Sequence, residues 1–214
     1  MIEMPRNIQL DVPYFILSFT EFASPCESFS PQTMTNYGMA YFLEDKSGNL
    51  TGSEFVDLHD RMRLSYRCTA HDATQSAYMI YDTTNTYGGT RPLLALTFGA
   101  DNHLGTINFS PESSMLMKKY LTKVSPLGSS RIRKFIASDG QEYRWGWPVK
   151  DDQEWTCTNS RGYLVAYYNL KTPGEPEYAH SSGCMLTVEQ AYGELVPEML
   201  ASLMIMRHIA AYNL

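Results

Sequence analysis

Hydrophobic residues fill almost every position near the end of the chain, from Met199 to Met206. Pro197 precedes this run and suits the first turn of a helix, where its missing N–H is not needed. On a helix, these apolar side chains cover every face instead of one stripe. The pattern therefore predicts a helix over residues 195–212, about 27 Å long, that is buried on all sides.

Three surroundings could bury such a helix. A membrane span needs roughly 20 unbroken apolar residues, whereas Arg207 and His208 interrupt this run. A helix lying in the membrane interface needs a charged face, and this segment has none. We therefore expect the helix to form the centre of the protein itself, and we expect no transmembrane segment.

Short runs rich in aromatic and β-branched residues occupy the chain from about residue 63 onward, and turn signals separate them. The runs are LSYRCTAHD, SAYMIYDTT, RPLLALTFGAD, LGTINFSP, MKKYLTKV, RIRKFIAS, EYRWGW, EWTCTN, YLVAYYNLK and CMLTVE. An earlier stretch, YGMAYFLED, is typical of a strand that ends in a turn. Asp139-Gly140 is the clearest hairpin signal, because these residues suit the positive φ angles of a tight turn. This pattern predicts a meandering antiparallel sheet or barrel.

Strands and helix together predict a mainly β fold, an antiparallel and closed or nearly closed β-barrel around the buried hydrophobic C-terminal helix. Such a sheet would cover the helix, and the helix would fill the sheet. Residues 51–214 are predicted to form this single domain. Residues 1–50 are less regular, with a loop-like stretch SPCESFSPQTMTNYG, and we expect them to form an irregular N-terminal segment packed on the barrel.

The charge and the cysteines limit the function further. The formal net charge of -6 argues against a nucleic-acid partner, because phosphate neutralisation needs a basic footprint. Cys26, Cys68, Cys157 and Cys184 are too far apart in the sequence for a metal knuckle or a redox pair. The N-terminus has no signal-peptide pattern. We therefore expect reduced, mostly buried cysteines and a cytoplasmic protein.

Several of these segments resemble a family of fungal proteins of unknown function that is widespread in mushroom-forming fungi. The segments are LTFGADNHLGTINF, RKFIASDGQEYRW, EWTCTN, YLVAYYNLK and ASLMIMRHIAAYNL, and the resemblance covers roughly residues 60–214. Members look like a variant of the tubby-like barrel shared with plant LURP-one-related proteins and phospholipid scramblases. The resemblance implies strands around a central C-terminal helix, and it brings no established activity or catalytic residues.

Six basic residues lie between Glu112 and Asp139, with no acidic residue among them. They are Lys118, Lys119, Lys123, Arg131, Arg133 and Lys134. A hairpin turning at SPLGSS would place Arg131 and Arg133 beside Lys119 or Lys123. The result is either an ordinary solvated hairpin or a local site for a phosphate or a lipid headgroup. The resemblance favours the second interpretation, because some tubby domains bind such lipids through basic residues.

Alternating aromatic residues form a second candidate surface. Tyr143, Trp145 and Trp147 share one face of a strand and either pack in the core or form a wall for an apolar ligand. We expect Trp145 in the core. Gly146 and Pro148 indicate that the strand ends there, so we expect Trp147 to line a pocket.

Arg207 and His208 interrupt the buried helix, and a buried charge must be paired. Arg207 is expected to bond to a strand carboxylate or to carbonyl groups, and His208 to be neutral and hydrogen-bonded. Alternatively, both lie at the mouth of a pocket, with Cys184 or His180. Two His-Asp pairs, at residues 59–60 and 71–72, are read as solvated turns and not as a metal site.

The sequence has none of the common motifs of hydrolases, zinc proteases or nucleotide-binding enzymes. We therefore predict a non-catalytic binding protein for an anionic lipid headgroup or a hydrophobic small molecule, peripheral to membranes, with no metal or cofactor. The predicted ligand-binding residues are Lys119, Lys123, Arg131, Arg133, Tyr143, Trp145, Trp147 and His208. The alternatives are an enzyme of unfamiliar type with its site at the barrel mouth, and a structural or oligomeric protein.

Overall fold

A computed structural model describes residues 38–85, 92–125, 129–147, 155–171, 174, 176 and 179–214 of the chain. Contacts between Cα atoms divide the chain into two units, Met1–Thr35 and Asn36–Leu214, and every described element belongs to the second. The predicted irregular N-terminal segment therefore lies, up to residue 37, outside the described residues.

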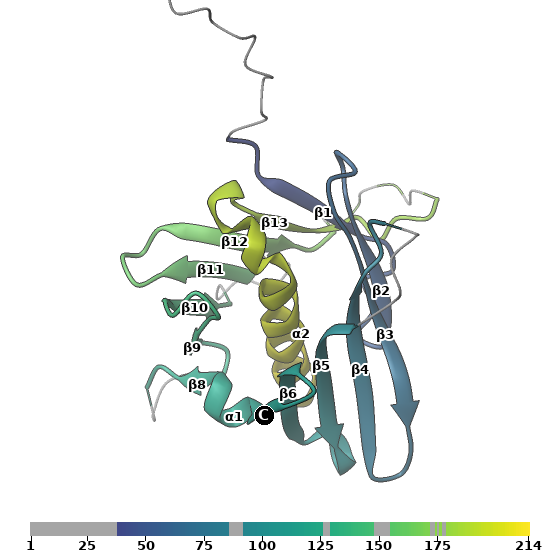
Figure 1. The fold of residues 1–214 in the computed structure, drawn as a ribbon, viewed down its shortest axis with the longest axis vertical. Coiled ribbons are helices and arrows are strands. Elements are labelled where there is room, and N and C mark those ends of the chain that lie inside the picture. Colours follow the sequence, from purple (N-terminus) through teal and green to yellow (C-terminus); the bar gives the residue numbers. More distant parts are fainter. Residues whose placement is uncertain are drawn as a thin grey trace, which may run out of the picture. The chain divides into compact units, whose positions relative to one another are not determined.

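Thirteen antiparallel strands in the described residues form one sheet (Figure 1). The strands are β1 (Tyr41–Asp45), β2 (Gly52–Asp57), β3 (Arg63–His71), β4 (Gln75–Asp82), β5 (Pro92–Gly99), β6 (Leu104–Ser110), β7 (Ser113–Leu116), β8 (Thr122–Lys123), β9 (Arg133–Ile136), β10 (Glu142–Gly146), β11 (Trp155–Asn159), β12 (Leu164–Asn169) and β13 (Cys184–Val188). The helices are η1 (Ala100–Asn102), α1 (Met117–Tyr120), η2 (Gln190–Leu195) and α2 (Val196–Tyr212). The predicted mainly β, antiparallel fold with a C-terminal helix is thus confirmed.

The strand order is that of a single meander whose first and last strands pair. The sheet runs β7-β6-β5-β4-β3-β2-β1-β13-β12-β11-β10-β9-β8. In the pairing of β1 with β13, Tyr41 lies opposite Val188 and Asp45 opposite Cys184. The edge strands of this order, β7 and β8, are neighbours in the sequence, and α1 connects them. No pairing of β7 with β8 exists among the described strands, so hydrogen bonds do not close the sheet into a barrel.

Helix α2 is buried on all faces, as the sequence predicts. Twelve of its 17 residues are buried, so no face is left for solvent along most of its length. Pro197 lies in its first turn, and Asn213 ends it in a left-handed conformation. Figure 1 shows α2 with β2–β5 on one side and β10–β12 on the other. The helix therefore forms the core on which the strands pack.

Two parts of the sheet differ from the prediction. Strand β2 was not expected, because Ser53 and Asp57 alternate with Phe55 on its buried face and break the apolar pattern. The run MKKYLTKV, expected as one strand, contains the α1 turn and only two strand residues. In this run Met117 and Tyr120 are buried, a spacing of three that suits one helical turn.

The hairpin at Asp139-Gly140 is confirmed, although only Gly140 has a positive φ.

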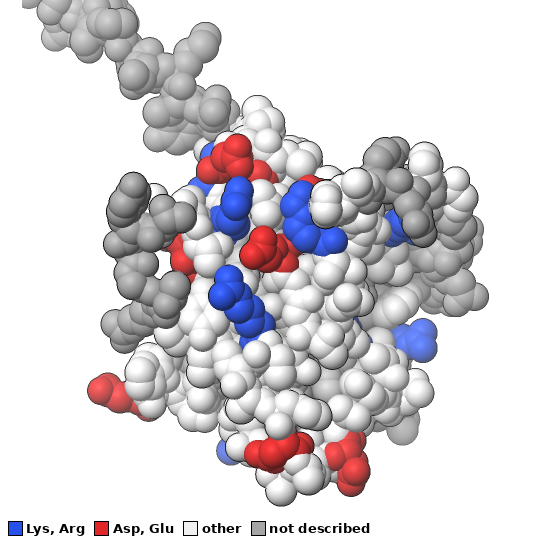
Figure 2. Space-filling model, turned by 90° about the vertical axis from the view of Figure 1, so that its right-hand side faces the viewer, with Lys and Arg blue, Asp and Glu red and all other residues white. Residues whose placement is uncertain are grey.

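Charged residues are unevenly spread over the outer surface. Figure 2 shows the side formed by β2–β5, where Lys, Arg, Asp and Glu gather in the upper half and at the lower rim.

Of the described cysteines, Cys157 and Cys184 are buried, as expected, whereas Cys68 is exposed. Within the described residues, no helix has both the length and the apolar character needed to cross a membrane.

The burial of α2 leads to a stability prediction with an internal control. Leu203 in α2 is fully buried, whereas Leu58 after β2 is 55% exposed. We expect Leu203→Ala to lower the free energy of unfolding by about 2–5 kcal/mol, because it leaves a cavity in the core. Leu58→Ala should change it by less than about 0.5 kcal/mol. Urea denaturation of both variants measures these values, and equal effects would contradict a central role for α2.

Candidate anion-binding site

The predicted basic hairpin is present as strands β8 and β9. Thr122 lies opposite Lys134, and Lys123 lies opposite Arg133. Directly opposed residues of an antiparallel pair point to the same face of the sheet. Lys123 and Arg133 are therefore neighbours, as expected for an anion site at this hairpin.

A pocket of about 400 Å³ opens beside this hairpin, and we call it the basic pocket. It is lined by His103, Leu104, Lys118, Thr122, Lys123, Arg133 and Leu214. Three of these side chains are cations, and the described lining includes no Asp or Glu side chain. An anion in the pocket would therefore meet positive charge from α1, β8 and β9.

Arg133 forms the fixed part of this positive wall. Its side chain is buried and donates hydrogen bonds to the carbonyl oxygens of Ser130 and Leu121 and to a main-chain oxygen of Leu214, the last residue of the sequence. Burial lowers the pKa of its guanidinium, and an arginine still keeps its charge at neutral pH. Because Arg133 is held by carbonyl groups, the two exposed lysines, Lys118 and Lys123, are the groups free to move toward a ligand.

Two other predicted basic residues lie elsewhere. Lys119 lines a separate pocket of about 260 Å³ with Met115, Lys134 and Ile136. Adjacent residues on a helical turn diverge by about 100°, which separates Lys119 from Lys118. The guanidinium of Arg131 lies 5.2 Å from the centre of the Trp147 ring.

The predicted aromatic residues divide between core and surface. Tyr143 and Trp145 are buried, and the Trp145 indole N–H donates a 2.8 Å hydrogen bond to Ser202 of α2. The core position expected for Trp145 is therefore confirmed. Trp147 is partly buried and stands edge-to-face with Trp155, their ring centres 4.3 Å apart. Its role in lining a pocket stays a prediction.

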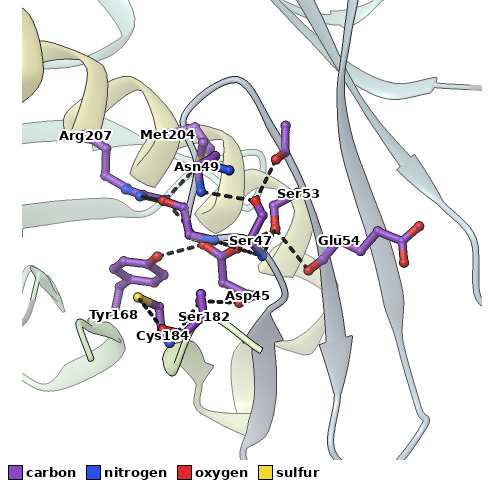
Figure 3. Close-up of polar contacts among 12 residues, drawn as sticks. Asp45, Ser47, Asn49, Ser53, Glu54, Tyr168, Ser182, Cys184, Met204 and Arg207 are labelled. Carbon is purple, nitrogen blue, oxygen red and sulfur yellow. Dashed lines mark hydrogen bonds and ion pairs between the residues drawn. The ribbon is translucent and has the colours of Figure 1, made fainter. Parts of the chain in front are cut away.

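Arg207 bonds both to a strand carboxylate and to a carbonyl group, as expected. Figure 3 shows it reaching from α2 toward the turn after β1. Its guanidinium donates to the Asp45 carboxylate over 3.4 Å and to the Gly48 carbonyl oxygen over 2.6 Å. Asp45 is fully buried and also accepts hydrogen bonds from Tyr168 (2.7 Å) and Ser53. The charge of Arg207 is thus paired inside the protein and structural.

His208 has a similar structural position. Its Nε2 lies 2.7 Å from the Asn102 carbonyl oxygen, which can only accept, so Nε2 carries a proton. Its ring stacks on Phe98 with ring centres 3.8 Å apart. Burial lowers the pKa of His208 below 6.5, and the bond to Asn102 opposes this shift. The geometry favours the neutral, hydrogen-bonded histidine and not a ligand-binding one.

Some residues of the site were not predicted. His103 and Lys118 line the basic pocket, although neither was chosen as a binding residue. Lys118 belongs to the basic stretch. The apolar residues Met117 and Tyr120, three apart, could have indicated a helical turn here, in which Lys118 and Lys119 point in different directions. His103 follows η1, and nothing in the sequence relates this turn to a hairpin 20 residues downstream.

The two His-Asp pairs lie in turns or strand ends, as expected. Asp60 has a positive φ in the turn before β3, and His71 contacts Ser76 across the β3–β4 hairpin. Asp72 accepts hydrogen bonds from Thr74 in that turn. Among the described residues, no three His, Cys, Asp or Glu side chains converge on a possible metal position.

No protein-family model, curated protein or solved structure matches the chain.

His208 leads to a prediction about pH. Because its pKa is lowered in the folded protein, the unfolded chain binds a proton below about pH 6.5 that the folded protein does not bind. Stability is therefore complete above this pH and declines as the pH falls. His208→Gln should flatten this decline while lowering stability at every pH, since it also loses the Phe98 stack. Chemical denaturation at pH 7.5 and 5.0 tests this, and parallel curves for both proteins would contradict it.

Proposed function

We propose that the protein binds a phosphate-bearing ligand, the headgroup of an anionic lipid, in the basic pocket, without chemical change to that ligand. The observation that carries this proposal is the convergence of Lys118, Lys123 and Arg133 on one concave site. Lysine and arginine are the side chains that proteins use for phosphate groups.

The distribution of charge supports the proposal. Residues 113–138 carry six positive charges and no negative one, so the rest of a chain with net charge -6 carries -12, since -6 minus +6 equals -12. An acidic protein with one basic region directs anions to that region. The basic region would also orient the protein at a membrane, because an anionic membrane repels the acidic rest of the chain.

Exposed apolar side chains beside the pocket favour a lipid over a free phosphate. Met115, Leu116 and Ile136 are 43%, 50% and 64% exposed. Met115 and Ile136 share a pocket with Lys119, Lys134 and Glu142, whose carboxylate pairs with Lys134. Apolar side chains between lysines suit the boundary between headgroups and acyl chains. Their exposure has a function if this edge of the sheet meets a bilayer.

The resemblance to the fungal family and the tubby-like fold belongs to the same proposal. The thirteen-strand sheet around α2 is compatible with a nearly closed barrel in which α1 covers the gap between β7 and β8. In such a barrel the basic pocket would lie at the gap. A cytoplasmic location, peripheral to membranes, follows as part of this proposal.

Binding is a better account than catalysis for the interior polar groups. Arg207 and His208, which an enzyme could use at a barrel mouth, already bond to Asp45 and Asn102. Burial raises the pKa of the Cys157 thiol, which keeps it protonated and weakly nucleophilic.

Liposome co-sedimentation tests the proposal. We expect binding to vesicles that contain phosphatidylserine or phosphorylated phosphatidylinositol at about 0.01 M salt, and weaker binding at about 0.1 M salt, where screening shortens to about 10 Å. The double variant Lys118→Glu/Lys123→Glu should bind at least about tenfold more weakly, because each basic residue near the surface contributes about 1 kcal/mol. Both lysines are exposed, so folding should be preserved.

The matched control is Arg63→Glu/Arg161→Glu, which changes the net charge equally at two exposed residues outside the pocket. We expect it to keep most of the binding. Equal losses in both double variants would reduce the effect to overall charge, and a wild-type protein that ignores anionic vesicles at low salt would refute the proposal.

A further inference from the structure

Strands β5 and β6 separate from each other part of the way along the sheet. Their pairing extends as far as Ala95 opposite Asn108. Beyond this pair β5 continues alongside β4, with Leu94 opposite Ile80, while β6 continues alongside β7, with Ser110 opposite Ser113. The sheet therefore contains a fork between two strands that each keep their other neighbour.

A pocket of about 310 Å³ occupies this fork. It is lined by Met79, Pro92, Leu93, Leu94, Ala95, Asn108, Phe109, Ser110 and Pro111. Leu94 is buried on the inner face, whereas Leu93 is 39% exposed, so the pocket leads from the surface toward the core. Its volume is within the range of small-molecule sites.

The described lining carries no charge. Its only polar side chains are those of Asn108 and Ser110. A charged ligand would find no partner here, whereas an apolar molecule would bury its surface against Leu93, Leu94 and Phe109.

Asn108 has an unmet hydrogen-bonding requirement at the apex of the fork. Its Oδ1 atom is buried and has no hydrogen-bond partner. A buried acceptor without a partner is uncommon and costs stability. A rotation of the side-chain amide, which exchanges its oxygen and nitrogen, would bring this oxygen to the pocket, where a ligand hydroxyl could donate the hydrogen bond that it lacks.

We infer that the fork between β5 and β6 is a binding site for a small, uncharged, mostly apolar molecule that carries a hydroxyl group. The ring or chain of the molecule lies between Leu93, Leu94 and Phe109, and its hydroxyl donates to the Asn108 oxygen. The site is separate from the basic pocket, which shares none of its described lining residues. It therefore stands whether or not the protein binds lipid headgroups.

Binding of 2-naphthol, a flat apolar molecule with one hydroxyl group, tests this site. In NMR titrations of the 15N-labelled full chain, we expect saturable shifts of the amides near residues 93–95 and 108–110, with a Kd below about 1 mM. Asn108→Leu should weaken binding by about tenfold through the lost hydrogen bond without lowering the unfolding temperature. The methyl ether of 2-naphthol, which cannot donate, should bind wild type and Asn108→Leu equally.

Two further variants fill the fork. Ala95→Phe should abolish binding of 2-naphthol. If Ala95→Phe does not fold, Leu93→Trp replaces it, because Leu93 is partly exposed and tolerates a larger side chain. Leu93→Trp should abolish binding as well. Lys118→Glu/Lys123→Glu should bind 2-naphthol as wild type does. The inference is overturned if wild type shows no saturable shifts, if the filling variants bind normally, or if Asn108→Leu leaves the affinity unchanged.

Discussion

Helix α2 can be buried only because its buried polar side chains find partners on the strands, turns and short helices around it. Glu198 accepts a 2.8 Å hydrogen bond from the Tyr120 hydroxyl of α1, and Ser202 accepts one from Trp145 of β10. Arg207 pairs with Asp45 of β1. Apolar packing alone is non-directional, so these bonds fix the rotation and the height of a helix that has no apolar stripe to orient it. Removing one partner would leave the other buried and unsatisfied.

The same constraint shapes the candidate site. The residues after α2 reach the hairpin at β8–β9, where a main-chain oxygen of Leu214 accepts a hydrogen bond from Arg133. That bond and those to Ser130 and Leu121 hold the guanidinium in the lining of the basic pocket, to which the exposed Lys118 and Lys123 also belong. The gap between β7 and β8 is thus the place where the helix, the edges of the sheet and the positive charge of an acidic protein come together.

Much of this could be predicted from the sequence, and the exceptions share one cause. The buried helix could be predicted because a helix with apolar residues on every face is stable in water only inside the protein. The pairing of Arg207 could be predicted because an unpaired buried charge is costly. The position of Lys118, the inward-facing polar residues of β2 and the fork beside Asn108 could not be predicted. Each depends on which strands become neighbours and where they part, and this is decided by contacts between residues far apart in the chain.

The most direct test of the central claim is a crystal structure of the protein with glycerol phosphate, a soluble analogue of a lipid headgroup. The account predicts the phosphate in the basic pocket, with oxygen atoms within hydrogen-bonding distance, about 2.7–3.2 Å, of Lys118 and Lys123. A phosphate bound at another surface while this pocket stays empty would contradict it.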